Sequence, residues 1–412
     1  MPDHFIKTTS DPFSSSSSSG ASMGAPKTTS SPSATTGAPS ASGAFTEGNL
    51  MEKKLVCPFC YTKQLLREKS PCPNEHCYSF IKKIGMPKEV FTHKLFPIAI
   101  VGASSSGKSH FLAALRHCLT KGDGARWGEG IKNGYWEWAF VEYSNSANDD
   151  ASVDNPYIGY EKRLFIDHRT LASTRRDDEH PPLLLSLKYL HPCKRLFDDP
   201  WFVKRSLLVA ITDTAGEHVQ EELIGKMDDN YPVLKRIKGI IIMLERDKAE
   251  EANSLLADFK RDTRKMEIPT ALCLSKIDEL PHHNEEFPTA WLNDRFNTNI
   301  SIPGRLVLPD IENNSNEVSK WMEARGDLQE TANNFKHSFK YHAFFAVSAL
   351  GRDPFSTDSD GRPVVDPSNG ALVLKGTPKP LRVMDPLLWI LWQYGQLGGI
   401  EKNAGFRKGG SL

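Results

Sequence analysis

The sequence predicts an α/β fold in which helices cover both faces of a mostly parallel β-sheet. Short apolar runs that suit buried strands alternate along the chain with stretches of helical periodicity. The runs are apolar at consecutive positions, so both faces of each strand are expected to be buried, as happens in a parallel sheet. Helices between the strands would supply the crossover connections that parallel strands require.

The first expected strand, Phe96–Val101, ends in a Gly/Ser loop and leads into a helix at Ser109–Leu119. The apolar side chains of that helix share one face: Phe111, Leu112, Leu115 and Cys118. Further buried strands are predicted at Leu183–Leu190, Leu207–Thr212, Gly239–Leu244, Ala271–Leu274 and Phe344–Val347. Further helices are predicted at Lys248–Lys265, Glu317–Ala324 and Met384–Tyr394. The aromatic stretch Trp127–Tyr143 is interpreted as additional sheet and core; the alternative is an insertion that binds a partner.

Composition divides the chain of 412 residues into four parts. Residues 1–47 consist almost wholly of Ser, Thr, Pro, Ala and Gly, which cannot bury enough apolar surface to offset chain entropy, so a disordered tail is predicted. We expect a small metal-binding ribbon at 53–82, a large α/β domain with insertions at 94–400 and a flexible tail at 401–412.

Net charge, apolar runs and cysteine positions limit where the protein is expected to work and what it is expected to bind. The formal net charge is zero, so composition gives no reason to expect bulk binding to nucleic acid or anionic lipid. No apolar run approaches the ~20 residues of a membrane span, and the first residues hold no signal-like stretch. Four of the seven cysteines are clustered, which fits a reducing compartment. We therefore expect a cytoplasmic protein.

The clustered cysteines have the spacing of a structural zinc site. Cys57, Cys60, Cys72 and Cys77 form a C-x₂-C-x₁₁-C-x₄-C pattern, and two thiolate pairs on turns can surround one tetrahedral Zn²⁺. His76 is an alternative ligand to Cys77, and two fortuitous pairs are the alternative to a metal site. Four thiolates leave no open position, so the metal is expected to be structural. Nearby basic residues permit nucleic-acid contact, but a protein-docking or structural role is preferred.

The loop after the first expected strand has the pattern of a phosphate-binding loop. Gly102 to Ser109 reads G-A-S-S-S-G-K-S and matches G-x-x-x-x-G-K-[ST] without a deviation. Gly102, Ser106 and Gly107 belong to a backbone that can wrap an anion with its N–H groups. Lys108 places a positive charge at the β and γ phosphates, and Ser109 offers a hydroxyl to Mg²⁺. The alternative, a plain Gly/Ser turn, gives the Gly-Lys-Ser end no packing purpose.

Two acidic motifs follow later strands. Asp213-Thr-Ala-Gly216 comes directly after the expected strand Leu207–Thr212; its aspartate can hold Mg²⁺ through water, and the Gly216 N–H can sense a γ-phosphate. In Ser275-Lys-Ile-Asp278, one carboxylate can accept both the N1 and N2 protons of guanine. Adenine offers an acceptor at N1 and would leave that carboxylate desolvated and unpaired. An ordinary turn and a capping aspartate are the respective alternatives.

Two further features are expected to contact the nucleotide base. The stem of Lys276 is expected to lie over the base. Ser348-Ala349-Leu350 follows the strand Phe344–Val347, and a loop there can present a backbone N–H to the base oxygen.

Taken in order, these four motifs resemble the TRAFAC class of P-loop GTPases, which includes the small Ras-like proteins; the resemblance covers roughly Pro97 to Gly351. It implies a P-loop NTPase fold that binds GTP and Mg²⁺. The long insertions, the cysteine cluster and the helix that begins at Asp385 resemble the bacterial double-GTPase proteins. That resemblance implies a protein partner, another GTPase or an effector, and a role in a bacterial conflict or signalling system.

The sequence departs from the Ras-like pattern at positions that matter for turnover. Ser275 stands where the class prefers Asn or Thr, and Glu217 stands where Ras-like proteins carry a water-orienting Gln. A carboxylate is repelled by the γ-phosphate, so hydrolysis is expected to be slow, to use His218, or to need a group from a partner. A switch threonine should close over Mg²⁺: Thr170, Ser173 and Thr174 are candidates, and Thr174 is our prediction.

The function predicted from these residues is a GTP-binding switch with slow or partner-stimulated hydrolysis. One alternative is an interaction scaffold that binds nucleotide without turning it over, which Glu217 favours. A weaker alternative is a nucleic-acid-binding ATPase, which Asp278 argues against.

Overall fold

The structure, a computed structural model, does not describe the predicted tails at 1–47 and 401–412. The residues that it describes are 54–75, 77, 85–103, 105–120, 126–127, 135–141, 156–171, 181–192, 201–213, 236–259, 266–278, 308–351 and 354–395. Within these residues, no helix combines the length and the apolar character that crossing a membrane requires.

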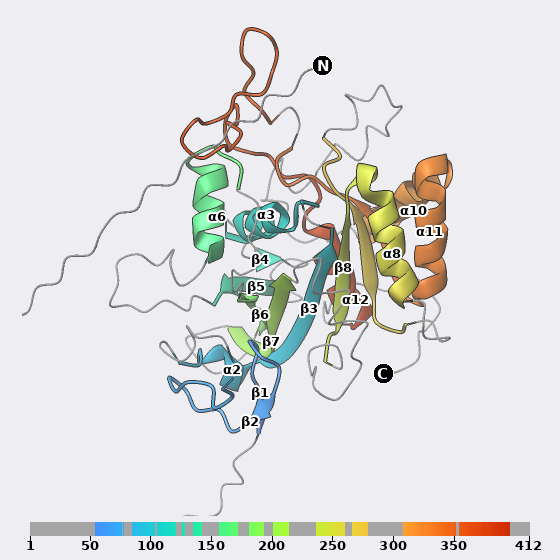
Figure 1. Cartoon of the computed structure of the whole chain (residues 1–412). Coiled ribbons are helices and arrows are strands. Elements are labelled where there is room, and N and C mark those ends of the chain that lie inside the picture. The colour runs from blue at the N-terminus through green and yellow to red at the C-terminus, as the bar shows by residue number, and fades with distance from the viewer. Residues whose placement is uncertain are drawn as a thin grey trace, which may run out of the picture. The chain divides into compact units, whose positions relative to one another are not determined.

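The centre of the fold is an eight-stranded sheet (Figure 1). Across the sheet the strands follow the order β10 (His342–Ala346), β9 (Thr270–Leu274), β8 (Gly239–Leu244), β3 (Lys94–Gly102), β7 (Trp201–Asp213), β6 (Leu183–Pro192), β5 (Tyr135–Phe140) and β4 (Arg126–Trp127). The pairings from β10 to β7 are parallel, and those from β7 to β4 are antiparallel. The predicted α/β P-loop fold with a mostly parallel sheet is therefore confirmed, and part of the Trp127–Tyr143 stretch extends the sheet through β5.

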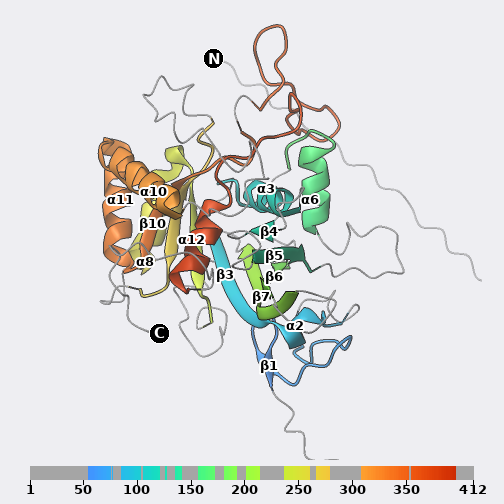
Figure 2. The same cartoon turned by 180° about the vertical axis from the view of Figure 1, so that it is seen from behind.

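Helices cover both faces of the parallel part of the sheet (Figures 1 and 2). Alternate residues of β3 point to opposite faces: Ile98 and Ile100 join one apolar cluster, and Ala99 and Val101 join another. The first cluster includes residues of α3 (Lys108–Thr120), α6 (Pro156–Phe165) and α12 (Asp385–Gln393). The second includes residues of α8 (Ala249–Phe259), α10 (Leu308–Glu323) and α11 (Gly326–Ser338).

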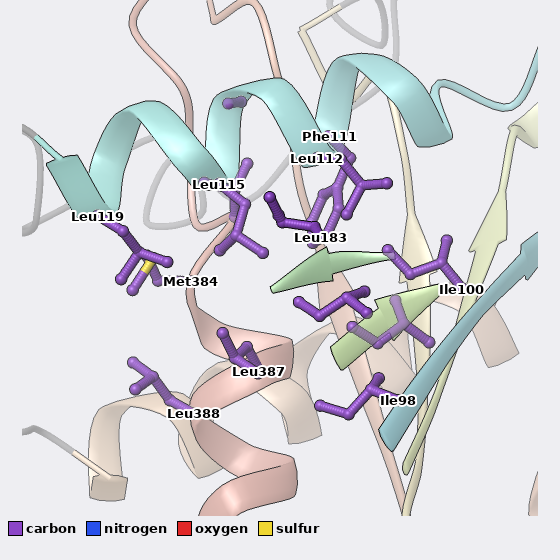
Figure 3. Close-up of a cluster of buried hydrophobic side chains, with 14 of the residues drawn as sticks. Ile98, Ile100, Phe111, Leu112, Leu115, Leu119, Leu183, Met384, Leu387 and Leu388 are labelled. Atoms are coloured by element: carbon purple, nitrogen blue, oxygen red, sulfur yellow. The ribbon is translucent and has the colours of Figure 1, made fainter. Parts of the chain in front are cut away.

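Helix α3, which follows the phosphate-binding motif, is fixed by its apolar face. Its side chains Phe111, Leu112, Leu115 and Leu119 are fully or almost fully buried. Figure 3 shows this face turned toward the sheet and toward Met384, Leu387 and Leu388, at the start of α12. Three of the four residues of the predicted helical face are therefore buried, and the fourth, Cys118, is partly buried against the same cluster. This face sets where the N-terminus of α3 lies.

The cysteine-rich segment packs on the antiparallel part of the sheet. It contains the two-stranded pair β1 (Leu55–Val56) and β2 (Lys63–Gln64), and the short helix α2 (Glu89–Thr92) follows it. Phe59 and Leu66 of this segment, with Met86 and Val90 just after it, form one apolar cluster with Leu184 of β6 and with Leu208 and Ala210 of β7. The ribbon thus shares a core with the α/β domain.

Candidate nucleotide site and metal centre

The four candidate nucleotide motifs follow strands that end at the same edge of the sheet. In the parallel register Ile100 lies beside Asp213, and Gly102 lies beside Met243. Further along the sheet, Leu244 pairs with Leu274, which in turn pairs with Ala346. Ligands of open α/β sheets bind at this carboxyl edge, so the register brings together the motifs that the sequence separates.

The backbone of the phosphate loop requires its glycines. A Cβ on Gly102 would lie 2.5 Å from the carbonyl oxygen of Met243 and 2.9 Å from Ser106 Oγ. Gly107 has a φ of +87°, in a region that residues with a Cβ rarely adopt. Ser106 is fully buried, and within the described residues its Oγ has no hydrogen-bond partner. These features fit a loop that brings its backbone and a buried hydroxyl close to an anion.

Lys108 and Ser109 lie at the start of α3, as the motif predicts. The Lys108 ammonium donates hydrogen bonds to the carbonyl oxygens of Gly102 and Ala103, at 2.9 and 3.0 Å. Burial lowers the pKa of Lys108, and the charge of Asp213 opposes that shift. Ser109 Oγ lies 3.5 Å from Asp213 Oδ2. A hydroxyl and a carboxylate this close are the hard oxygen ligands that Mg²⁺ prefers, so these residues fit a magnesium ion bound with a phosphate group.

The predicted base-selecting segment lies at the end of β9. Asp278 is buried, with 6% of the residue's surface exposed. Lys276 adopts a left-handed φ of 55° and forms an ion pair with Glu245. Ser275, which stands where the GTPase class prefers Asn or Thr, donates from its N–H and from its hydroxyl to the carbonyl oxygen of Leu244, at 2.8 and 3.1 Å. Ser275 therefore ties the end of β9 to the end of β8.

The loop after β10 has a defined hydrogen-bond pattern. The N–H of Ser348 donates to Leu381, and the N–H of Gly351 donates to Ser348 Oγ at 2.8 Å. The N–H of Leu350 also donates to this hydroxyl, at 3.3 Å. The N–H of Ser348 is thus engaged within the protein, so of the two predicted residues Ala349 is the candidate donor to a base oxygen.

Several predicted site residues lie outside the described residues: Ser173, Thr174, Gly216, Glu217 and His218. Their roles stay predictions. Thr170, the other switch candidate, is described, and its Oγ1 accepts a hydrogen bond of 2.9 Å from the N–H of Leu372. Its carbonyl oxygen accepts a bond from Arg163 Nε, also at 2.9 Å. Both oxygens that a switch threonine would use are thus engaged in this structure.

Sequence reasoning missed a histidine beside Ser109, one of the two residues predicted to hold Mg²⁺. His110 follows Ser109 on α3, and its Nε2 accepts a hydrogen bond of 3.1 Å from the N–H of Leu171. Burial lowers the pKa of His110 to about 4, so the ring is neutral at physiological pH and can accept this bond. The histidine links the first turn of α3 to the chain just before 172–180. No sequence motif marks this role, because the contact joins distant parts of the chain.

The segment between β10 and α12 was also not predicted. It pairs with the chain around Thr170 through backbone hydrogen bonds, among them one of 2.8 Å from the N–H of Leu374 to the carbonyl of His168. An ion pair between Arg169 and Asp366 adds to this contact. The same segment also contacts the loop after β10, where Leu381 and Ser348 exchange two backbone hydrogen bonds. The sequence here has no period of two or 3.6, so periodicity gives no signal for it.

The four cysteines come together as a candidate metal centre. Their Sγ atoms all lie within 4.8 Å of one another. The distance from Cys57 to Cys77 is 3.9 Å, and that from Cys60 to Cys72 is 3.8 Å. A tetrahedron of sulfurs about 2.3 Å from Zn²⁺ has edges of about 3.8 Å, so the arrangement fits this ion. His76, the alternative ligand, lies outside the described residues.

The thiols of the cluster affect one another's ionisation. A hydrogen bond from Cys57 lowers the pKa of Cys60, while the hydrogen bond with Cys57 raises the pKa of Cys77. Close thiols cannot all ionise without a compensating cation, because the thiolates would repel one another. A bound divalent cation would remove that repulsion, which supports a metal rather than four free thiols.

No protein-family model and no curated protein sequence matches the chain. Among solved structures, the signal recognition particle receptor SRb-GTP/SRX complex from Chaetomium thermophilum is 15% identical, with a TM-score of 0.26, and the match covers 63% of this chain and 94% of that chain. The GTP-bound Ski7 GTPase-like domain of S. cerevisiae is 12% identical, with a TM-score of 0.28 and coverage of 76% and 52%. A bacterial dynamin pair is 16% identical, with a TM-score of 0.22 and coverage of 66% and 43%. All three are distant from this chain in sequence and in geometry.

Proposed function

We propose that this chain is a magnesium-dependent GTP-binding switch protein whose hydrolysis is slow or is stimulated by a partner. The observation that carries the proposal is the pairing of Ser109 with Asp213 beside the partly buried Lys108, at the same sheet edge as Asp278. A phosphate chain bound by the loop would reach the first three residues. A base at the other end of the site would reach Asp278.

In this proposal each side chain has a definite task. Lys108 would exchange its bonds to the loop carbonyls for bonds to phosphate oxygens, and its charge would stabilise the leaving γ-phosphoryl group. Ser109 and Asp213 would hold Mg²⁺, which when bound neutralises phosphate charge. Asp278 would accept the N1 and N2 protons of guanine, and the Ala349 N–H would donate to the base oxygen. Thr174 and Gly216 are proposed to sense the γ-phosphate.

The two alternative functions make different demands on Glu217 and Asp278. A scaffold that binds nucleotide without turnover would use the same cradle, and Glu217 favours it by repelling the γ-phosphate. An ATPase would leave the buried carboxylate of Asp278 without a partner on the base. We propose a protein partner on the strength of the expected slow turnover. A place in a bacterial conflict or signalling system is proposed from the resemblance to double-GTPase proteins.

Changing Asp278 to Asn should reduce the preference for guanine. An amide cannot accept two protons as the carboxylate does, so the gap between GTP and ATP affinity should narrow by about tenfold. Xanthine carries a carbonyl in place of the 2-amino group of guanine, and the Asn amide can donate to it. Xanthosine triphosphate should therefore bind Asp278→Asn more tightly than the wild type. Competition titrations with the three nucleotides measure this, and an unchanged order of affinities would contradict the assignment.

Changing Glu217 to Gln distinguishes the possible roles of this side chain. If the carboxylate only occupies the site of the attacking water, the variant should bind GTP as the wild type does and hydrolyse it faster, because repulsion is replaced by a neutral hydrogen-bonding group. We expect this outcome. A lower single-turnover rate would instead identify Glu217 as a general base. His218→Asn, measured in parallel, reports whether the neighbouring ring contributes.

A further inference from the structure

One buried tyrosine of the ribbon reaches the strand that carries Asp213. Tyr61 directly follows Cys60 and is 1% exposed. Its backbone has a left-handed φ of 56°, which is costly for a residue with a Cβ and persists only where the surroundings hold it. Here the surroundings are the cysteine turn itself, because the N–H of Tyr61 donates to the carbonyl of Cys57 at 2.9 Å. The turn that presents two metal ligands therefore also sets where the tyrosine lies.

The hydroxyl of Tyr61 meets a hydroxyl of the central sheet. Tyr61 Oη and Thr212 Oγ1 share a short hydrogen bond of 2.6 Å, across 151 positions of sequence. Thr212 is the residue before Asp213 on β7. Loss of one hydroxyl would leave the other without this partner in a partly buried contact, which weakens the hold on the strand end.

The two neighbouring residues of β7 face opposite sides of the sheet. Thr212 pairs with Ala99, which lies on the face of the sheet that α8, α10 and α11 cover. Asp213 pairs with Ile100, which lies on the face that α3 covers, and its carboxylate lies near Ser109. Consecutive strand residues alternate in this way, so a contact that fixes Thr212 from one face also fixes the backbone that aims Asp213 from the other.

We propose that Tyr61 is a positioning residue that couples the cysteine centre to the magnesium site through Thr212. With the ribbon folded around its metal, the Tyr61 hydroxyl holds the end of β7, and the Asp213 carboxylate stays beside Ser109. Without that contact, β7 frays at its last residues and Asp213 is held less well. The proposal rests on the proposed function in one respect, namely that Asp213 helps to hold Mg²⁺ with a nucleotide.

The test measures GTP affinity as a function of magnesium concentration. The variants are compared by the concentration at which half of the magnesium-dependent gain in affinity is reached. Tyr61→Phe and Thr212→Val each remove one hydroxyl and keep the shape, and each should raise this concentration about fivefold, as expected for one net hydrogen bond. The double variant should show no further rise, because both changes remove the same contact. GTP affinity measured without magnesium should not change. A role in stability alone would lower the melting temperature and leave the magnesium dependence unmoved.

The matched control is Ser206→Ala, on the same strand. Ser206 Oγ donates to the carbonyl of Thr92 at 2.9 Å, so this variant also removes one contact between β7 and the segment that follows the ribbon, but far from Asp213. It should leave the magnesium dependence at the wild-type value. Equal magnesium dependence in Tyr61→Phe and the wild type would overturn the coupling, as would an equal rise in Ser206→Ala.

Hydrogen exchange without nucleotide separates this proposal from the proposed function. Backbone amides of 207–213 should exchange faster in Tyr61→Phe, and also in wild-type protein treated with a chelator selective for Zn²⁺ over Mg²⁺. Unchanged exchange in both samples would overturn the coupling. Failure of the wild type to bind any nucleotide would instead overturn the proposed function, and the exchange result would still decide whether the ribbon holds the strand end.

Discussion

Lys108→Ala should weaken GTP binding about 100-fold and reduce single-turnover hydrolysis to the background rate. The partly buried ammonium donates to the carbonyl oxygens of Gly102 and Ala103, so it lies in the loop where its charge would act on a bound phosphate. The same charge holds the ground state and stabilises the transition state, so the variant should lose both affinity and rate. Binding and single-turnover measurements on purified protein give the two losses separately.

The control for this variant is Lys340→Ala. Lys340 is exposed and pairs with Glu267 at 2.8 Å, and an exposed ion pair contributes little to stability or to a distant site. It should bind and hydrolyse GTP as the wild type does. If Lys108→Ala hydrolysed GTP at the wild-type rate, the proposal that this site catalyses hydrolysis would be contradicted. A wild-type rate at background, with and without candidate partners, would favour the scaffold.

Cys57→Ser combined with Cys60→Ser should release the metal and destabilise the whole described fold. Metal analysis of the wild type should find about one Zn²⁺ per chain, and the double variant should retain almost none. The ribbon shares its core with Leu184 and Leu208 of the sheet, and uncovering each leucine costs about 1.5–3 kcal/mol. The melting temperature should fall by about 5 °C or more.

Cys118→Ser controls for the loss of a thiol outside the cluster. Cys118 is partly buried on α3 and belongs to no group of metal ligands among the described residues, so its change should leave the zinc content at the wild-type value. Wild-type protein prepared without chelators and found free of metal would contradict the zinc assignment. A double variant that loses zinc and keeps its melting temperature would contradict the shared core.

The central strands were predictable because burial on both faces leaves a strong local signal. Strand β8 has the predicted bounds, Gly239–Leu244, since every residue of it is apolar or small. The antiparallel pairing of β7 with β6 was not predictable in the same way, because an apolar run looks alike in either direction of pairing. Helix α11 was missed although its core residues Leu328, Ala332 and Phe335 have helical spacing, since polar residues fill most of the segment.

Motif residues and supporting residues of the site differ in how the sequence reveals them. Lys108, Ser109 and Asp213 belong to short motifs whose chemistry fixes their spacing, and the structure brings Ser109 and Asp213 together. The contact of Tyr61 with Thr212 depends on how two segments dock, and no spacing rule covers a pair so far apart. The ribbon docks because many apolar side chains are buried together between it and strands β6 and β7. Local sequence patterns carry no information on such long-range packing.

The most direct test of the central claim is a calorimetric titration of the wild-type protein with GTP and with ATP, each in the presence of Mg²⁺. The buried Asp278 carboxylate should make GTP bind at least about tenfold more tightly than ATP, a difference of about 1.4 kcal/mol or more. Equal affinities for the two nucleotides, or tighter binding of ATP, would contradict the assignment of this site to guanine nucleotides.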